Sequence, residues 1–206
     1  MNLNKEKSLF KKGYRCVAGL DEVGRGPLAG PVFAAAVVAK LNTKYRILNT
    51  KIKDSKALTP KQREVFYNFL TKHPAIRWGI GSVSEKVIDR INILQATKRA
   101  MIRAIKNLEK RNKKTKIDYL IIDGNFAIKT KIFQESIIKG DAKIFSCAAA
   151  SIIAKVTRDR LMDKYHKKYP QYGFNKHKGY PTKKHRLLIK KYGRCKIHRL
   201  TFKSDI

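Results

Sequence analysis

Acidic residues are scarce in this sequence. Only 15 of its 206 residues are aspartate or glutamate, against 48 lysines and arginines, and the formal net charge is +33. Because the basic residues are spread along the whole length, the charge indicates a basic globular protein and not a neutral domain with a basic tail. Such a charge favours a phosphate-rich partner, a nucleic acid above all. Lysine faces that are merely solvated are the alternative.

Long apolar runs are missing as well. No stretch approaches the ~20 apolar residues of a membrane-spanning helix. Residues 1–7 also lack the apolar run of a signal peptide. We therefore expect a cytoplasmic protein that does not bind membranes.

Cysteines are few. Cys16, Cys147 and Cys195 are odd in number and widely spaced, which argues against a disulfide framework and fits a reducing compartment. The candidate zinc ligands would be Cys195, His177, His185 and His198. Their spacing matches no recognised zinc motif, and the lysines around them oppose a dication. We therefore do not expect a zinc site.

The first half of the chain alternates strand and helix patterns. Residues 16–20 and 32–38 are apolar runs typical of buried strands, and together they predict a hairpin with a long loop. A capping box at residues 59–62 opens a helix that continues to about Lys72. Residues 76–83 predict a third strand.

The second half begins with a long amphipathic helix that Ser84 caps. Its predicted buried stripe consists of Val87, Ile91, Leu94, Met101, Ile105 and Leu108. A strand at 118–125, a weaker one around 137–138, a helix from Ala142 to about Tyr165, and a basic helix from Thr182 to Gly193 complete the chain. This order predicts a mixed sheet with helices packed on it.

The composition divides the chain into three parts. Residues 1–15 hold many lysines and little apolar periodicity, and they predict a mobile basic lead-in. Residues 16–163 form the core. Residues 164–206 are rich in lysine, histidine and tyrosine, and we expect a basic helical segment that packs on the core as part of one functional unit.

Carboxylates stand at the ends of apolar runs at three places: Asp21 with Glu22, Asp123, and Asp141. A buried carboxylate without a partner is costly, so such positions are normally paired with bases or bind a metal. Oxygen ligands clustered at strand ends favour Mg²⁺ or Mn²⁺. Combined with a charge suited to a polyanion, they favour a two-metal phosphodiester site.

Each of these positions also has a structural interpretation. Asp141 precedes a predicted helix and is a candidate N-cap. Asp123 with Gly124 is typical of a turn. Asp21 and Glu22 are candidates for ion pairs with nearby basic residues.

A glycine-rich stretch follows the first carboxylate pair, and we call residues 24–31 the glycine loop. The loop does not match the dinucleotide-binding fingerprint G-x-G-x-x-G, because Ala29 occupies the position of the third glycine and the glycine follows one residue later. No helix pattern follows the loop either. Glycines let a backbone approach a sugar-phosphate closely, with Arg25 near the phosphate. A tight turn between two strands is the structural alternative, and the two are compatible.

A series of short motifs runs through the chain in a fixed order. They are AGLDEVGRGPLAGPV at 18–32, DSK at 54–56, NILQAT at 92–97, IDGN at 122–125, KGDAK at 139–143, AASIIAKVTRD at 149–159, HKGY at 177–180 and HR at 198–199. With these motifs the sequence resembles bacterial ribonuclease HII, the type 2 ribonuclease H. The resemblance covers nearly everything from Ala18 to Phe202.

The resemblance implies a ribonuclease H-like α/β fold, with a mixed five-stranded sheet flanked by helices and a C-terminal basic helical segment. It implies that the metal-binding catalytic carboxylates are Asp21, Glu22, Asp123 and Asp141. It implies that Gly24, Arg25 and Gly26 sense the ribonucleotide 2′-hydroxyl and that Tyr180 stacks on the following deoxyribose. Lys56 matches a family lysine near the substrate phosphates.

The implied reaction is endonucleolytic hydrolysis of RNA in RNA/DNA hybrids and at single ribonucleotides in duplex DNA, leaving 5′-phosphate and 3′-hydroxyl ends. Two divalent ions, Mg²⁺ or Mn²⁺, would lie about 3.5 to 4 Å apart, one activating a water and one stabilising the leaving oxygen. The 2′-hydroxyl distinguishes RNA from DNA at one nucleotide. We also expect a monomer.

Two alternatives are weaker. Ribonuclease HIII resembles this family but carries an additional N-terminal substrate-binding domain, and only about 15 residues precede the core of this sequence. A non-catalytic basic protein such as a ribosomal component would explain the charge. It would not explain four carboxylates placed at the ends of apolar runs.

Overall fold

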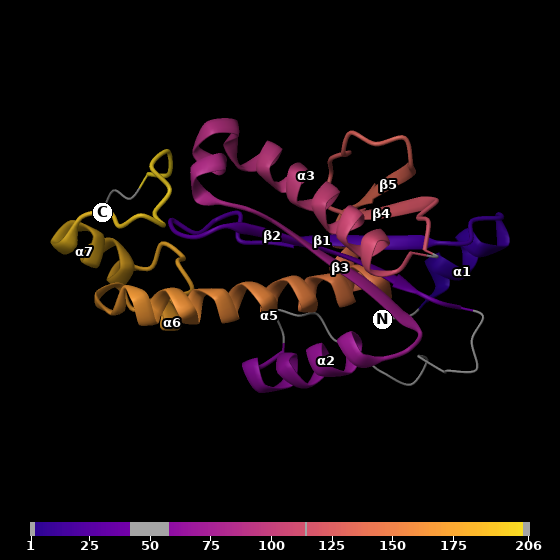
Figure 1. The fold of residues 1–206 in the computed structure, drawn as a ribbon, viewed down its shortest axis with the longest axis horizontal. Helices are drawn as coiled ribbons and strands as arrows, with labels where there is room; N and C mark the ends of the chain where they lie inside the picture. The colour runs from indigo at the N-terminus through magenta and orange to yellow at the C-terminus, as the bar shows by residue number, and fades with distance from the viewer. Residues whose placement is uncertain (1–2, 42–57, 114, 204–206) are drawn as a thin grey trace.

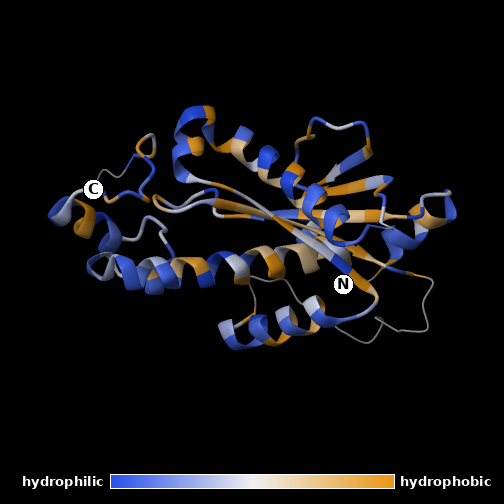
Figure 2. Cartoon of the chain, viewed as in Figure 1, coloured by the Kyte–Doolittle hydropathy of each residue, from blue (hydrophilic) through white to orange (hydrophobic). Residues whose placement is uncertain are grey.

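A central sheet between two layers of helices makes up the fold (Figure 1). The computed structural model describes residues 3–41, 58–113 and 115–203. Helix α3 (Glu85–Arg111) covers one face of the sheet, and α5 (Phe145–Lys168) with α2 (Pro60–Lys72) covers the other. Apolar residues concentrate on the strands and on the inner sides of these helices (Figure 2).

The sheet has the order β3-β2-β1-β4-β5. Its strands are β1 (Val17–Val23), β2 (Val32–Ala39), β3 (Ile76–Val83), β4 (Tyr119–Asp123) and β5 (Phe133–Ile137). The pairs β1–β2 and β2–β3 are antiparallel, whereas β1–β4 and β4–β5 are parallel. The predicted mixed sheet of five strands is therefore confirmed, and β1 is its middle strand.

Both helical layers approach the sheet closely where strands carry glycine. A Cβ on Gly81 of β3 would lie 2.1 Å from the carbonyl oxygen of Ala100 in α3. On the other face, a Cβ on Gly19 of β1 would lie 2.4 Å from the Ser146 hydroxyl in α5. Real Cβ contacts are longer, so glycine at these two positions sets the distance between the layers.

The N-terminal residues contradict the prediction of a mobile lead-in. Helix α1 (Asn4–Lys11) packs on the core through Leu9, which is 3% exposed. Glu6 is also buried, and its carboxylate accepts a hydrogen bond from the Ser146 N–H at 2.9 Å. The prediction was wrong because a single short apolar face and one buried carboxylate anchor a segment whose overall composition is basic.

Helix α3 departs from the predicted stripe in its first part. Met101, Ile105 and Leu108 are buried as predicted, but Leu94 is 36% exposed. Asn92 has φ 62° and ψ 167°, which interrupts the helix, and its Oδ1 accepts a hydrogen bond from the Gln95 N–H. A new helical segment therefore starts after Asn92 with a different rotation, so Leu94 does not continue the buried stripe.

The other helix predictions hold with small changes. The capping box of α2 is present, and α7 (Lys183–Tyr192) begins after Thr182 and ends at Gly193. The helix predicted from Ala142 is two helices, because α4 (Gly140–Lys143) and α5 are separated by the extended residue Ile144.

Between α5 and α7 lie the short 3-10 helix η1 (Pro170–Tyr172) and α6 (Phe174–His177). Helix α5 runs without a break across the predicted boundary at residues 163–164, so the core and the C-terminal segment share one rigid element. Nowhere in the described ranges does a helix combine the length and apolar character that a membrane crossing needs.

The close contact between β3 and α3 gives a stability prediction. Gly81→Ala should lower the free energy of unfolding by about 3 kcal/mol, because the added methyl meets main-chain atoms of α3 that cannot turn aside. Urea unfolding measures the change. Gly26→Ala is the matched control, since the nearest atom to its Cβ is 3.9 Å away; a change within about 0.5 kcal/mol is expected. Equal effects of the two variants would contradict this packing.

Candidate active site

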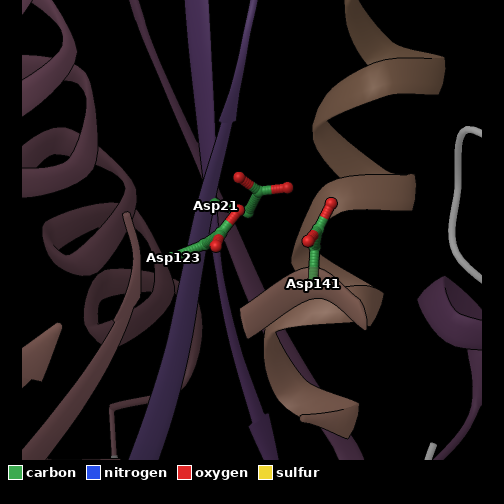
Figure 3. Close-up of side chains that lie close together, drawn as sticks. All are labelled: Asp21, Asp123 and Asp141. Atoms are coloured by element: carbon green, nitrogen blue, oxygen red, sulfur yellow. The ribbon is translucent and has the colours of Figure 1, made fainter. Parts of the chain in front are cut away.

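Three carboxylates from different elements converge at one end of β1. Asp21 lies on β1, Asp123 is the last residue of β4, and Asp141 lies in α4. One carboxylate oxygen of each lies within 4.8 Å of the others, and the side chains point toward a common centre (Figure 3). The parallel register pairs Leu20 with Ile122, so the aspartates that follow them stand side by side.

The start of α4 fixes the third carboxylate. The Gly140 N–H donates to Asp123 Oδ1 at 2.8 Å, which ties α4 to the end of β4. The residue that precedes the helix is Lys139, with φ 57°, so Asp141 stands inside the first turn and is not the N-cap. At 4% exposure, Asp141 is buried with its carboxylate among the other two.

Burial and like charge dominate the electrostatics. Burial raises the pKa of Asp21 well above its ordinary value, and the charges of Glu22 and Asp123 raise it further, although hydrogen bonds from Ser151 and the Glu22 N–H oppose this. Burial also raises the pKa of Glu22, against the effect of Arg25, whose Nη1 lies 3.2 Å from Glu22 Oε1. A cation among these groups would relieve both desolvation and repulsion.

The donor set fits a hard divalent ion. Asp21, Asp123 and Asp141 offer only carboxylate oxygens, the ligands that Mg²⁺ and Mn²⁺ prefer. Glu22 is not part of this group of three, but it lines the same cavity as Asp21 and Asp123. The structure thus brings together all four carboxylates that the sequence predicted for the site.

A cavity of about 390 Å³ opens beside the carboxylates. Its lining residues are Asp21, Glu22, Val23, Gly24, Arg63, Asp123, Ser151, Lys155 and Tyr180. Acidic side chains therefore line the same cavity as basic and aromatic side chains from α2, α5 and the C-terminal segment. Such a cavity can hold metal ions beside its acidic residues and a phosphate chain beside its basic ones.

The predicted substrate residues lie around this cavity. Gly24 and Tyr180 line it, and a Cβ on Gly26 would lie 3.9 Å from Cε1 of Tyr180, so the glycine loop faces the tyrosine ring. Arg25 is 44% exposed at the same end. Lys56 lies outside the described residues.

Two buried arginines, which the sequence interpretation missed, hold the glycine loop. Arg158 of α5 donates to the carbonyls of Pro31 and Ala29, and Arg199 donates to those of Gly24, Arg25 and Gly30. Both side chains are at most 1% exposed. Five loop carbonyls are therefore fixed by charged donors, which make stronger hydrogen bonds than neutral ones.

Gly24 makes room for this arrangement. It has φ +93°, and a Cβ there would lie 2.4 Å from Arg158 Nε. The glycine loop therefore needs glycine at this position for both its backbone conformation and its contact with α5.

A polar stripe on α5 is the sequence signal that could have revealed Arg158. Ser151, Lys155 and Arg158 follow one another at spacings of four and three residues in a helix otherwise rich in alanine and isoleucine, so they share one face. Ser151 bonds to Asp21, Lys155 lines the cavity, and Arg158 holds the loop. The stripe faces the site along its whole length.

Known sequences resemble this chain closely. The family model described as Ribonuclease HII matches residues 18–205. A protein named Ribonuclease HII from Acetivibrio thermocellus is 53% identical over 97% of this chain and 74% of its own length. Another of that name from Syntrophus aciditrophicus is 48% identical over 96% of this chain and 89% of its own length.

Solved structures resemble its fold. The ribonuclease H2 of Pyrococcus horikoshii superposes with a TM-score of 0.73 at 30% identity, covering 92% of this chain and 94% of the other. The Bst ribonuclease HIII in complex with Mn²⁺ superposes with a TM-score of 0.68 at 18% identity, covering 92% and 67%. The second likeness concerns the fold alone.

The charge cluster makes a prediction for the metal-free protein. Asp21→Asn should raise the midpoint of thermal unfolding at about pH 8, because the raised pKa of Asp21 means that ionisation costs folded-state stability. This loss of stability begins as the pH rises above 3.8, the ordinary pKa of the carboxyl group, and is absent below it. The gain in melting temperature of Asp21→Asn should therefore vanish near pH 3.8. Circular dichroism melts in a chelator measure this.

Asp89→Asn is the control, for which we expect a change of opposite sign in the midpoint of thermal unfolding. Burial by itself would raise the pKa of Asp89, but hydrogen bonds from Thr201 and Leu200 outweigh it and lower this pKa, so the charge of Asp89 stabilises the fold above the ordinary pKa. This variant should melt below the parent at pH 8. An Asp21→Asn gain that is equally large at acidic and alkaline pH would contradict the proposed repulsion.

Proposed function

The chain belongs to the ribonuclease HII family, and from this premise we propose that Asp21, Glu22, Asp123 and Asp141 are the catalytic, metal-binding residues of its reaction. The chain is an endonucleolytic ribonuclease H that acts on RNA/DNA hybrids. The observation that carries the proposal for the site is the convergence of three aspartates from β1, β4 and α4, of which Asp21 and Asp141 are buried and Asp123 is half-buried.

The metal that these residues hold is Mg²⁺ or Mn²⁺. Divalent ions at such a site supply an activated water and stabilise charge on the leaving oxygen. The part of the protein is to hold the carboxylates rigidly: Asp21 through the Glu22 N–H at 2.7 Å and Asp123 through the Gly140 N–H at 2.8 Å. Both bonds orient a carboxylate before substrate arrives, which favours catalysis because no reorganisation is needed.

The glycine loop and Tyr180 recognise the substrate. Gly24, Arg25 and Gly26 sense the 2′-hydroxyl of a ribonucleotide, and Tyr180 stacks on the deoxyribose that follows it. Their closeness supports this role, since the loop faces the ring at Gly26. With both contacts the enzyme cuts at single ribonucleotides embedded in duplex DNA as well as in hybrids, leaving 5′-phosphate and 3′-hydroxyl ends.

A second cavity extends the basic surface beyond the site. It has a volume of about 460 Å³ and shares Arg63 and Lys155 with the cavity beside the carboxylates. Arg160, Lys176 and Lys178 also line it, and its basic side chains outnumber its acidic ones although Arg160 and Lys178 form ion pairs with Glu64 and Asp163. This surface suits the phosphates of the duplex on one side of the cut, whose binding should be salt-dependent.

The remaining expectations from the sequence fit the same function. Lys56 is proposed to contact the substrate phosphates. The enzyme is proposed to act as a monomer in the cytoplasm, on RNA/DNA hybrids and on duplex DNA that contains ribonucleotides.

Removal of one charge at the centre tests the catalytic proposal. Asp21→Asn keeps the shape of the side chain but removes a metal ligand, so we expect cleavage of a duplex with one ribonucleotide to fall about a thousandfold or more in Mg²⁺. Binding of the same duplex should stay within about threefold, because phosphate contacts supply most of the affinity. Single-turnover cleavage and fluorescence anisotropy measure the two effects. Parental cleavage by Asp21→Asn would refute the metal assignment.

Removal of the tyrosine ring tests the recognition proposal. Tyr180→Ala should lower kcat/KM at least about tenfold on duplex DNA with one ribonucleotide, because stacking contacts are worth about 1–3 kcal/mol. The loss of kcat/KM should be smaller on a uniform RNA/DNA hybrid, because the enzyme can bind there at a neighbouring nucleotide and make other contacts. Tyr180→Phe is the control and should keep the activity, since it retains the ring. Equal losses of Tyr180→Ala on both substrates would contradict junction recognition.

A further inference from the structure

Three of the five histidines gather behind Tyr180 in the C-terminal segment. His185 and His198 are 0% and 3% exposed, and His177 stacks on His185 with ring centroids 4.3 Å apart. Tyr172 and Phe174 pack against the edges of these rings. The ring nitrogens do not face a common point as metal ligands would: they hydrogen-bond to one another and to the main chain, and Nδ1 of His198 also lies 3.1 Å from the Cys195 sulfur.

The partners of these nitrogens determine where each proton sits. The Cys195 N–H donates to Nδ1 of His198 at 2.9 Å, so His198 carries its proton on Nε2. That proton points at Nε2 of His185, 3.1 Å away, which must then accept. His185 therefore carries its proton on Nδ1 and donates it to the carbonyl of Tyr180 at 2.9 Å.

The same assignment follows from the other end. A carbonyl oxygen can only accept, so Nδ1 of His185 must donate to Tyr180, and its Nε2 is left to accept from His198. The result is a one-directional chain of hydrogen bonds from the Cys195 N–H through two neutral imidazoles to the Tyr180 carbonyl. Burial supports neutrality, because it lowers the pKa of both His185 and His198 to about 4.

The backbone that carries Tyr180 is fixed from three sides. Residues 178–180 offer three successive carbonyl oxygens, and each accepts a hydrogen bond from a different element. Arg158 of α5 donates to the first at 2.9 Å, Leu28 of the glycine loop to the second at 2.8 Å, and His185 of α7 to the third at 2.9 Å. The third carbonyl also accepts the Thr182 N–H at 2.8 Å.

We propose that His185 and His198 are positioning residues for Tyr180, and that their directional hydrogen-bond chain sets the preference of the enzyme for a ribonucleotide next to a deoxyribonucleotide. The proposal rests on the proposed junction-reading role of Tyr180. Neither histidine lines the cavity beside the carboxylates, so both act only through the main chain that holds the ring. Loss of the chain should therefore affect substrate preference and leave the metal centre as it is.

Two substitutions of His185 separate positioning from simple packing. The side-chain amide of asparagine reaches the place of Nδ1, so His185→Asn keeps a donor for the Tyr180 carbonyl. The amide of glutamine reaches the place of Nε2, so His185→Gln keeps a partner for His198 and loses that donor. Both variants are polar and open a similar space in the cluster.

The measurement is kcat/KM on duplex DNA with one ribonucleotide and on a uniform hybrid. For His185→Gln we expect the ratio between the two substrates to fall about tenfold, as for the loss of one hydrogen bond. For His185→Asn we expect a ratio within about threefold of the parent. Equal ratios in the two variants would overturn the proposal.

Tyr180→Ala, measured in parallel, distinguishes this failure from that of the proposed function. An equal loss on both substrates in Tyr180→Ala contradicts junction reading itself, and the positioning proposal with it. A selective loss in Tyr180→Ala together with equal ratios in the His185 variants contradicts the positioning proposal alone.

The unmodified protein gives a second test that does not depend on a variant folding. In ¹⁵N-resolved NMR spectra of the imidazoles, His185 should appear as the Nδ1–H tautomer and His198 as the Nε2–H tautomer. Neither should titrate between about pH 5.5 and pH 8, where an ordinary histidine does. Rapid exchange of tautomers, or a titration near the ordinary pKa, would overturn the proposed chain.

Discussion

The structure depends on the burial of several like charges at one point. Asp21, Glu22 and Asp123 would separate if their elements were free to move, because desolvation of Asp21 and repulsion from the other two charges oppose their approach. The parallel pairing of β1 with β4 and the bond from Gly140 to Asp123 prevent this. The apolar layers on both sides of the sheet supply the stability that allows such a site to persist.

Local patterns predicted most of the fold, whereas contacts between distant segments explain what was missed. The capping box of α2 and the cap of α7 depend on residues within one turn, so the sequence alone revealed them. The burial of Glu6 depends on Ser146, and the contact between Arg199 and Gly24 joins the two ends of the chain. No spacing in the sequence encodes such contacts.

In the site, too, local motifs predicted some features, and contacts between distant segments explain the others. Its four carboxylates were predicted because each ends an apolar run and matches a family motif, but their convergence follows from the sheet register. The kink at Asn92, a non-glycine residue with positive φ, displaced the predicted stripe of α3. Arg158 was missed because it bonds to main-chain carbonyls of the glycine loop. Every residue has such a carbonyl, so the residue types in the loop do not indicate the contact.

Helix α5 also fixes a distance within the site. Ser151 bonds to Asp21, and Arg158, seven residues later, holds the glycine loop, so the two anchor residues are separated by a helical rise of about 10 Å. Because a hydrogen-bonded α-helix keeps its length, the separation between these two residues stays constant. The proposed catalytic carboxylates and the loop proposed to recognise the sugar are then held by one helix, at two points about two helical turns apart.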